Sequence, residues 1–258
     1  MSRNRPRIKS NKLRQEVKFL SQSLEINSYA QMEGPKPKTW SIHDLKSISP
    51  LTYNQKNMFD LFYDVNLVCH GSAGTGKSYC ALYLAFKDIL VEKLYQKVII
   101  VRSTVPVREQ GFLPGTQEEK EAIYEAPYED ILADLFKRNS TYKDMKKAGL
   151  IEFKSSSYIR GLTWDDSIVL IDEAQNMTLE ELNSIMGRIG QNSKVIVLGD
   201  TLQNDLVKRS NDQSGFPTFL KVIQKMDCFE EIKFTKEDII RSGFVKEWIT
   251  AFEEHLQK

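Results

Sequence analysis

The stretch Gly71-Ser72-Ala73-Gly74-Thr75-Gly76-Lys77-Ser78 decides the fold of this chain. It matches the phosphate-binding loop pattern G-x-x-x-x-G-K-[ST] at every fixed position. An apolar run at 65–69 precedes it and predicts a strand, while an Ala- and Leu-rich run at 78–92 predicts a helix. Glycines let the backbone N–H groups turn toward phosphate oxygens, and the helix N-terminus adds partial positive charge. This context favours a phosphate-binding loop over a chance match on a glycine-rich turn.

Each position of the loop has an expected role in binding ATP with Mg²⁺. Lys77 should reach the β- and γ-phosphates, and the Ser78 hydroxyl should ligate Mg²⁺. The other positions should form the backbone cradle around the phosphates; they are Gly71, Ser72, Ala73, Gly74, Thr75 and Gly76.

A pair of carboxylates follows another apolar run, 168–171. Asp172 is placed to hold Mg²⁺ through water, and Glu173 is placed to polarise the attacking water as a base. Gln175 lies close enough in sequence to act near the γ-phosphate. The alternative is that two acidic residues merely cap a turn between a strand and a helix. Following a complete phosphate-binding loop, the pair favours ATP hydrolysis.

Further apolar runs predict buried strands at 98–101 and 195–198. Helix-forming stretches alternate with the strands, including 117–148, where Pro127 predicts a break. Near-continuous apolar strands separated by helices indicate a parallel sheet covered by helices on both faces. We therefore expect an α/β fold of the RecA-like P-loop NTPase class, with an extra strand between the loop strand and the strand that carries the carboxylate pair.

Two weaker candidates involve glutamine side chains. Gln203 follows the strand predicted at 195–198 and is placed to sense the γ-phosphate, because the carboxyl ends of neighbouring parallel strands meet at one crevice. Gln55 precedes the first strand by about ten residues, and its amide could pair with the adenine edge. A polar turn at the strand end would also explain Gln203.

Three arginines are candidates for a finger that stabilises transferred phosphate. Arg241 and Arg188 are the favoured ones, and Arg102 follows the strand at 98–101. The residue could act within its own chain or from a neighbouring subunit. An ordinary salt bridge is the alternative for each of them.

The two ends of the chain differ from its middle. We expect 1–50 to be a basic, flexible N-terminal extension and 51–258 to be the RecA-like ATPase domain; in the first 20 residues only Glu16 opposes the Lys and Arg side chains. The extension either contacts phosphate backbones or is a solvated tail. At the other end, apolar residues at helical spacing predict an amphipathic helix whose aromatic side chains join the core. They are Phe244, Trp248, Ile249, Phe252 and Leu256.

Composition narrows the class of protein. The formal net charge of the 258 residues is +1, so nucleic-acid binding would need a local basic patch. The three cysteines, Cys69, Cys80 and Cys228, form no C-x-x-C pair, which argues against a disulfide framework or a structural zinc site. No run of about 18 apolar residues and no signal peptide is present. We therefore expect a cytoplasmic protein without a membrane span.

Several short motifs occur in this order along the chain: GSAGTGKS at 71–78, GFLPG at 111–115, YIRGLT at 158–163, IVLIDEAQN at 168–176, RIG at 188–190, GDTLQNDL at 199–206 and KEDIIRS at 236–242. Taken in this order, they resemble the PhoH family of P-loop ATPases, relatives of the superfamily 1 helicase core. The resemblance covers roughly residues 50–252. One departure is Arg102-Ser103, where many relatives have Arg-Pro, and this weakens any role carried over for that turn.

The resemblance implies an ATP-dependent protein linked to RNA or single-stranded DNA, commonly as a ring-shaped homo-oligomer, with a hexamer favoured. A ring would place the nucleotide between subunits, which suits an arginine supplied by the neighbour. Some relatives carry a PIN nuclease domain before the ATPase, and the first 50 residues are too few for one, so we expect no intrinsic nuclease. Short members of the family are frequent in bacteriophages, which suggests a phage origin and the host cytoplasm.

Two other functions stay open from the sequence. An ATP-gated adaptor that changes protein partners would share every nucleotide-binding residue with a nucleic-acid motor. A nucleoside kinase of the type II thymidine kinase class also combines a phosphate-binding loop with a D-E-A-Q sequence. Such kinases usually have a zinc ribbon and lack the G-D-x-x-Q element that begins here at Gly199.

Overall fold

The computed structural model describes residues 40–104, 117–159, 161–200 and 213–256. All of them belong to one compact unit, Thr39–Lys258. Most of the extension expected at 1–50, and the candidate Gln203, lie outside the described residues. None of the helices within the described ranges is both long enough and apolar enough to cross a membrane.

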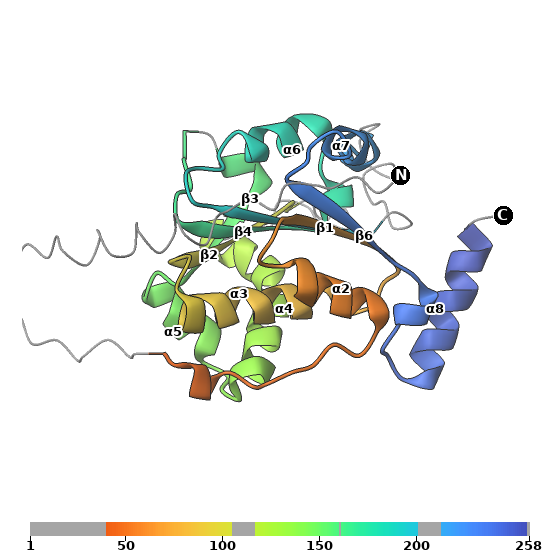
Figure 1. Ribbon diagram of the computed structural model, residues 1–258, viewed down its shortest axis with the longest axis horizontal. Coiled ribbons are helices and arrows are strands. Elements are labelled where there is room, and N and C mark those ends of the chain that lie inside the picture. Colours follow the sequence, from red (N-terminus) through yellow and green to blue (C-terminus); the bar gives the residue numbers. More distant parts are fainter. Residues whose placement is uncertain (1–39, 105–116, 160, 201–212, 257–258) are drawn as a thin grey trace, which may run out of the picture. The chain divides into compact units, whose positions relative to one another are not determined.

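The described residues form a six-stranded sheet, ordered β3-β2-β4-β5-β1-β6, in which every pair of neighbours is parallel (Figure 1). β5 lies between the loop strand β1 and the carboxylate strand β4, so the predicted extra strand is confirmed. The strands are β1 (Asn66–Gly71), β2 (Lys97–Arg102), β3 (Ile151–Ser155), β4 (Ser167–Asp172), β5 (Lys194–Gly199) and β6 (Phe229–Phe234).

Helices cover both faces of this sheet, which confirms the predicted α/β class. In Figure 1, α6 and α7 lie on one face, and α2, α3, α4 and α5 lie on the other. The helices are α2 (Tyr53–Leu61), α3 (Lys77–Lys87), α4 (Gln117–Phe136), α5 (Thr141–Lys147), α6 (Leu179–Met186), α7 (Phe216–Ile223) and α8 (Gly243–Leu256). Short helical turns are η1 (Ile42–Asp44), η2 (Asp88–Glu92), η3 (Ser156–Tyr158), η4 (Ala174–Asn176) and η5 (Lys236–Asp238).

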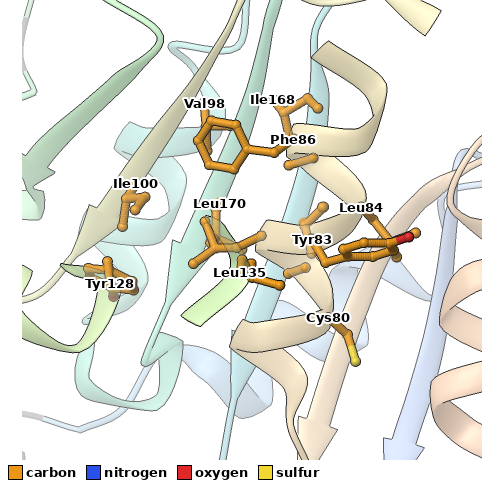
Figure 2. Close-up of a cluster of buried hydrophobic side chains, with 14 of the residues drawn as sticks. Cys80, Tyr83, Leu84, Phe86, Val98, Ile100, Tyr128, Leu135, Ile168 and Leu170 are labelled. Atoms are coloured by element: carbon orange, nitrogen blue, oxygen red, sulfur yellow. The ribbon is translucent and has the colours of Figure 1, made fainter. Parts of the chain in front are cut away.

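Strand alternation divides the core into two layers. Successive side chains of a strand point to opposite faces, so Val98 and Ile100 of β2 join the cluster under α3 and α4, whereas Ile99 and Val101 join the cluster under α6 and α7. Figure 2 shows the first layer, where Phe86 of α3 and residues of α4 meet the strands. Both faces are buried, which is why the central strands are apolar without interruption.

Helix α4 does not break where the sequence predicted. It runs through Pro127, and the chain turns only at 137–140, before α5. Leu132 and Leu135 in its second half are fully buried in the layer under α3. The break at Pro127 was therefore wrong: burial of the apolar side of the helix outweighs the backbone hydrogen bond that proline removes.

The C-terminal helix α8 forms as expected, but its aromatic residues are not in the core. The exposed fractions are 78% for Phe244, 63% for Trp248 and 46% for Phe252. Their spacing of four residues places them on one face of the helix, and the rings of Trp248 and Phe252 stack with centroids 6.3 Å apart. The prediction that they are buried is wrong, because helical spacing defines a face and not what covers it.

Candidate nucleotide site

Parallel strands bring the candidate residues to one edge of the sheet. The register pairs Arg102 at the end of β2 with Asp172 at the end of β4. It also pairs His70 of β1 with Gly199, the last residue of β5. The phosphate-binding loop follows β1 directly, so the loop, the carboxylates and the end of β5 meet at the carboxyl edge, where open α/β sheets bind ligands.

The loop backbone requires its glycines. Gly71, Gly74 and Gly76 have φ values of 117°, 71° and 80°, a region that other residues rarely adopt. A Cβ on Gly71 would lie 1.9 Å from the carbonyl oxygen of Phe234 on the neighbouring strand β6. The backbone N–H of Ser72 donates to the same oxygen at 3.2 Å. The end of β1 is thus tied to β6 where the chain turns into the loop.

Lys77 lies folded over its own loop. Its Nζ donates to the carbonyl oxygens of Gly71 at 2.9 Å and Ser72 at 2.7 Å, and to the hydroxyl of Thr75 at 3.3 Å. Burial lowers the pKa of Lys77, and the carboxylates of Asp200, Asp172 and Glu173 act in the opposite direction. A cation held inside the loop by carbonyl groups is well placed to exchange them for phosphate oxygens.

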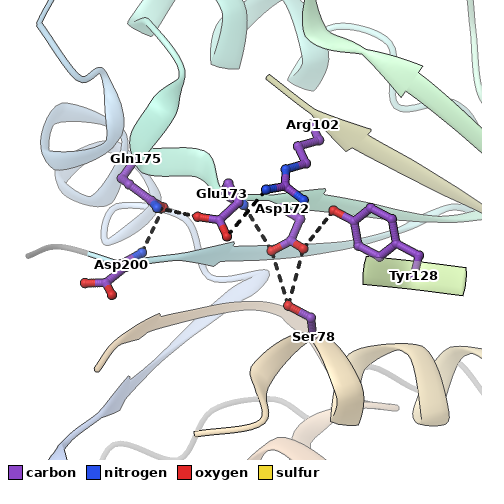
Figure 3. Close-up of polar contacts among 7 residues, drawn as sticks. All are labelled: Ser78, Arg102, Tyr128, Asp172, Glu173, Gln175 and Asp200. Carbon is purple, nitrogen blue, oxygen red and sulfur yellow. Dashed lines mark hydrogen bonds and ion pairs between the residues drawn. The ribbon is translucent and has the colours of Figure 1, made fainter. Parts of the chain in front are cut away.

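The predicted metal ligands face each other. The Ser78 hydroxyl, in the first turn of α3, lies 3.4 Å from Oδ1 and 3.3 Å from Oδ2 of Asp172 (Figure 3). A hydroxyl and a carboxylate are hard oxygen ligands of the kind that Mg²⁺ takes together with phosphate oxygens. The described part of the chain holds no group of three His, Cys, Asp or Glu side chains that could bind a metal ion. The hydroxyl and carboxylate of this pair are the kind of ligands that fit Mg²⁺ arriving with a nucleotide.

Asp172 has a partner that the sequence did not reveal. The Tyr128 hydroxyl of α4 donates to its Oδ2 at 2.9 Å, and the backbone N–H of Glu173 donates to its Oδ1 at 3.0 Å. Tyr128 is only 1% exposed. Burial, with the nearby charge of Asp172, raises the pKa of Tyr128 well above its usual value, so the hydroxyl keeps its proton and donates. The two residues are 44 positions apart, and only the packing of α4 on the sheet joins them.

Glu173 occupies a strained position beside Asp172. Its φ is 54°, which is uncommon for a residue with a side chain and is often found at functional sites. Burial first, and then the neighbouring Asp172, raise the pKa of Glu173. Arg102 Nη2 lies 3.9 Å from its Oε1, and the Gln175 amide donates to its Oε2 at 2.5 Å. Gln175 Oε1 in turn accepts from the backbone N–H of Asp200 at 2.9 Å, which links the turn to the end of β5.

Gln55 supports the loop from α2. Its Nε2 donates to the carbonyl oxygen of Thr75 at 2.9 Å, and its Oε1 accepts from the backbone N–H of Leu51 at 2.8 Å. The side chain is 2% exposed. Both ends of the amide are therefore engaged within the chain, and adenine recognition by Gln55 stays a prediction.

The two favoured arginines lie in different places. Arg241 packs against the loop: a Cβ on Gly74 would lie 2.9 Å from its Cγ, and the N–H of Ile240 donates to the Gly74 carbonyl at 3.2 Å. Arg188 follows α6, and its carbonyl accepts from the N–H of Trp164, just before β4 begins. Arg188 is thus at the amino edge of the sheet, away from the loop of its own chain, and a finger role for it stays a prediction for a neighbouring subunit.

Helix α8 also contacts the loop, which sequence reasoning missed. The Ser72 hydroxyl donates to Glu253 Oε2 at 3.0 Å. The Cδ1 of Ile249 would lie 3.3 Å from a Cβ on Gly74. The inner side of α8 therefore packs on the loop, and its aromatic side faces away.

Comparison with curated proteins gives consistent matches. A PhoH-like protein of Mycobacterium leprae is 35% identical over 213 residues, which cover 81% of this chain and 60% of that protein. A PhoH-like protein of Bacillus subtilis is 35% identical, covering 71% of this chain and 57% of that protein. Protein PhoH of Escherichia coli is 32% identical, covering 70% and 51%. The chain thus spans between about half and 60% of the length of these relatives.

Among solved structures, the Pif1 helicase of Candida albicans aligns over 77% of this chain and 43% of that one, with 17% identity and a TM-score of 0.36. A similarity this loose carries no functional information. The family pattern described as PhoH-like protein matches residues 47–253, which is most of the chain. This protein therefore belongs to the PhoH family.

Proposed function

We propose that this protein binds ATP with Mg²⁺ and hydrolyses it. The observation that carries the proposal is the meeting of Ser78 in the phosphate-binding loop with Asp172, at 3.3 Å, beside Glu173. A loop cation, a hydroxyl, a metal-type carboxylate and a second carboxylate at one edge of a parallel sheet are the parts that ATP hydrolysis requires.

The loop residues bind and orient the triphosphate. Lys77 exchanges its contacts with the carbonyls of Gly71 and Ser72 for the β- and γ-phosphate oxygens. Ser78 and Asp172 would hold Mg²⁺, which neutralises phosphate charge when bound. Arg241, which already packs on Gly74, supplies a second cation from the same chain. Catalysis here consists mainly of positioning and charge stabilisation.

Glu173 activates the attacking water. Its raised pKa brings the carboxylate closer to the range in which a general base both accepts a proton and stays ionised. Arg102 keeps a positive charge 3.9 Å away, which favours the ionised form. The Gln175 amide donates to Oε2 of Glu173, so that Oε1 faces the Arg102 guanidinium and the site.

The direct test measures phosphate release from ATP by the wild type in Mg²⁺ and in EDTA, with Lys77→Ala as the blank. We expect hydrolysis that depends on Mg²⁺ and is lost in the variant, because Lys77 is the cation within the loop. Equal release by Lys77→Ala would contradict the proposal. Transfer of phosphate to thymidine in place of water would favour a nucleoside kinase.

We also propose that hydrolysis is coupled to RNA or single-stranded DNA in a ring-shaped homo-oligomer, with a hexamer favoured. Membership of the PhoH family supports this. Arg188, which lies at the amino edge of the sheet beside Trp164, is our candidate for an arginine supplied by a neighbouring subunit. The ATPase rate with and without each polymer, and the mass of the particle in solution, test it. An ATPase rate that neither RNA nor single-stranded DNA changes would favour an ATP-gated adaptor with a protein partner.

A further inference from the structure

We infer that Tyr128 is a positioning residue for the carboxylate that takes part in Mg²⁺ binding, so that helix α4 is part of the nucleotide site. The inference deepens the proposed function and rests on it. Figure 3 shows the Tyr128 hydroxyl directed at Asp172 from the α4 side, opposite the turn that carries Glu173. The contact is 2.9 Å long and buried.

The two oxygens of Asp172 are held from different elements. Oδ1 accepts from the Glu173 backbone at 3.0 Å, within its own turn. Oδ2 accepts from Tyr128, on α4. Ser78 lies almost equidistant from both oxygens, at 3.4 and 3.3 Å. A carboxylate whose two oxygens each accept from a donor fixed by the fold, besides the Ser78 hydroxyl, has little freedom to rotate about its χ2 angle, which would otherwise be broad.

Tyr128 is itself fixed by packing. Its ring lies 6.2 Å from the ring of Phe153 on β3, measured between centroids. Leu132 and Leu135, one and two turns further along α4, are fully buried in the core layer. The hydroxyl therefore cannot follow Asp172 if the carboxylate turns, and the helix dictates the orientation of Oδ2.

The positive charge of Arg102 links the Tyr128–Asp172 contact to Glu173, the second carboxylate of the pair. Arg102 interacts with the Tyr128 hydroxyl and with Asp172, and it lies 3.9 Å from Glu173 Oε1. Neither Tyr128 nor Arg102 belongs to the phosphate-binding loop or to the carboxylate pair. Together they orient both carboxylates from elements that approach the carboxyl edge of the sheet beside β4.

A merely structural role is the competing explanation, since any buried hydroxyl needs a partner. The chain offers a matched control in Tyr142 of α5, which is also 1% exposed and donates to a carboxylate, Glu125 Oε2, at 2.5 Å. Removing either hydroxyl should lower thermal stability. Only the hydroxyl of Tyr128 should change how the protein responds to Mg²⁺.

The experiment measures binding of a fluorescent ADP analogue at increasing Mg²⁺, for the wild type, Tyr128→Phe and Tyr142→Phe. For Tyr128→Phe we expect the half-saturating Mg²⁺ concentration to rise about tenfold, because partners that orient metal ligands commonly contribute 10- to 100-fold to metal affinity. Affinity for the analogue in EDTA should stay unchanged. Tyr142→Phe should keep the wild-type Mg²⁺ dependence.

Three results would overturn the inference. The half-saturating Mg²⁺ concentration of Tyr128→Phe could equal that of the wild type, it could be lower, or it could rise equally in Tyr128→Phe and Tyr142→Phe. Wild-type protein that does not bind the analogue in Mg²⁺ would instead contradict the proposed function. If Tyr128→Phe does not fold, hydrogen exchange of the wild type decides. Backbone amides of α4 around Tyr128 should gain protection with ADP and Mg²⁺ relative to ADP in EDTA, and no gain would overturn the inference.

Discussion

Replacing Gly71 by alanine should destabilise the fold strongly. Two terms add at this position. A side chain at φ 117° is strained, which costs about 1–3 kcal/mol. The new Cβ would also lie 1.9 Å from the Phe234 carbonyl oxygen, so β1 and β6 must separate, and such overpacking costs about 1–3 kcal/mol. Together they amount to roughly 2–6 kcal/mol, against a total stability of about 5–15 kcal/mol.

Gly149→Ala is the matched control, because it separates the two terms. Gly149 also has a positive φ, 72°, but a Cβ there would meet nothing within 4 Å. It should therefore cost about 1–2 kcal/mol, from the left-handed backbone alone. Urea unfolding of both variants, followed by tryptophan fluorescence, gives the two free energies. If Gly71→Ala lowers the free energy of unfolding by no more than Gly149→Ala does, then β6 does not approach the loop as closely as described.

Two further predictions concern charged side chains. Arg241→Ala should reduce ATP hydrolysis at least tenfold even in dilute protein, whereas Arg188→Ala should reduce it only at concentrations where the protein assembles. ATPase rates measured across protein concentrations test this. An effect of Arg188→Ala in dilute protein, with an effect of Arg241→Ala only in the assembled particle, would refute the roles given to the two arginines. Asp88→Asn should raise stability by about 1–3 kcal/mol at pH 8 and by little at pH 4. Burial raises the pKa of Asp88 from 3.8 to about 6. The wild type therefore has its full stability below pH 4, where Asp88 is neutral in both states, and loses part of it as the pH rises through 6 and the buried carboxylate becomes charged. Urea unfolding of variant and wild type at both pH values tests this, and equal gains would contradict it.

The central strands and the loop could be predicted because their signals are local. The centres of four strands are uninterrupted apolar runs, and the loop and the carboxylate pair are short motifs adjoining two of these strands. The edge strands β3 and β6 were missed: half-buried or exposed positions separate their buried ones, and they include charged side chains such as Glu152 and Glu231. An edge strand has a neighbour on one side only, so its sequence tolerates polar residues.

The missed parts of the site depend on contacts between distant segments. No local pattern indicates that Tyr128 reaches Asp172, or that Glu253 of α8 reaches Ser72, 181 positions away. For Gln55, the sequence predicted a position close to the nucleotide, but the structure engages its amide with the loop backbone. Motifs identify the reacting groups, whereas the residues that orient them follow from packing.

The most direct test of ATP hydrolysis by the carboxylate pair is the single-turnover rate of Glu173→Gln, measured beside its affinity for ATP. The substitution keeps the size of the side chain and one oxygen that can accept from Gln175, but it removes the base and the charge that faces Arg102. The rate should fall about 100-fold or more, which is the usual contribution of a general base, while ATP affinity stays near that of the wild type. Glu180→Gln, on the exposed start of α6, is the control and should behave as wild type. A Glu173→Gln protein that hydrolyses ATP at the wild-type rate would contradict the account.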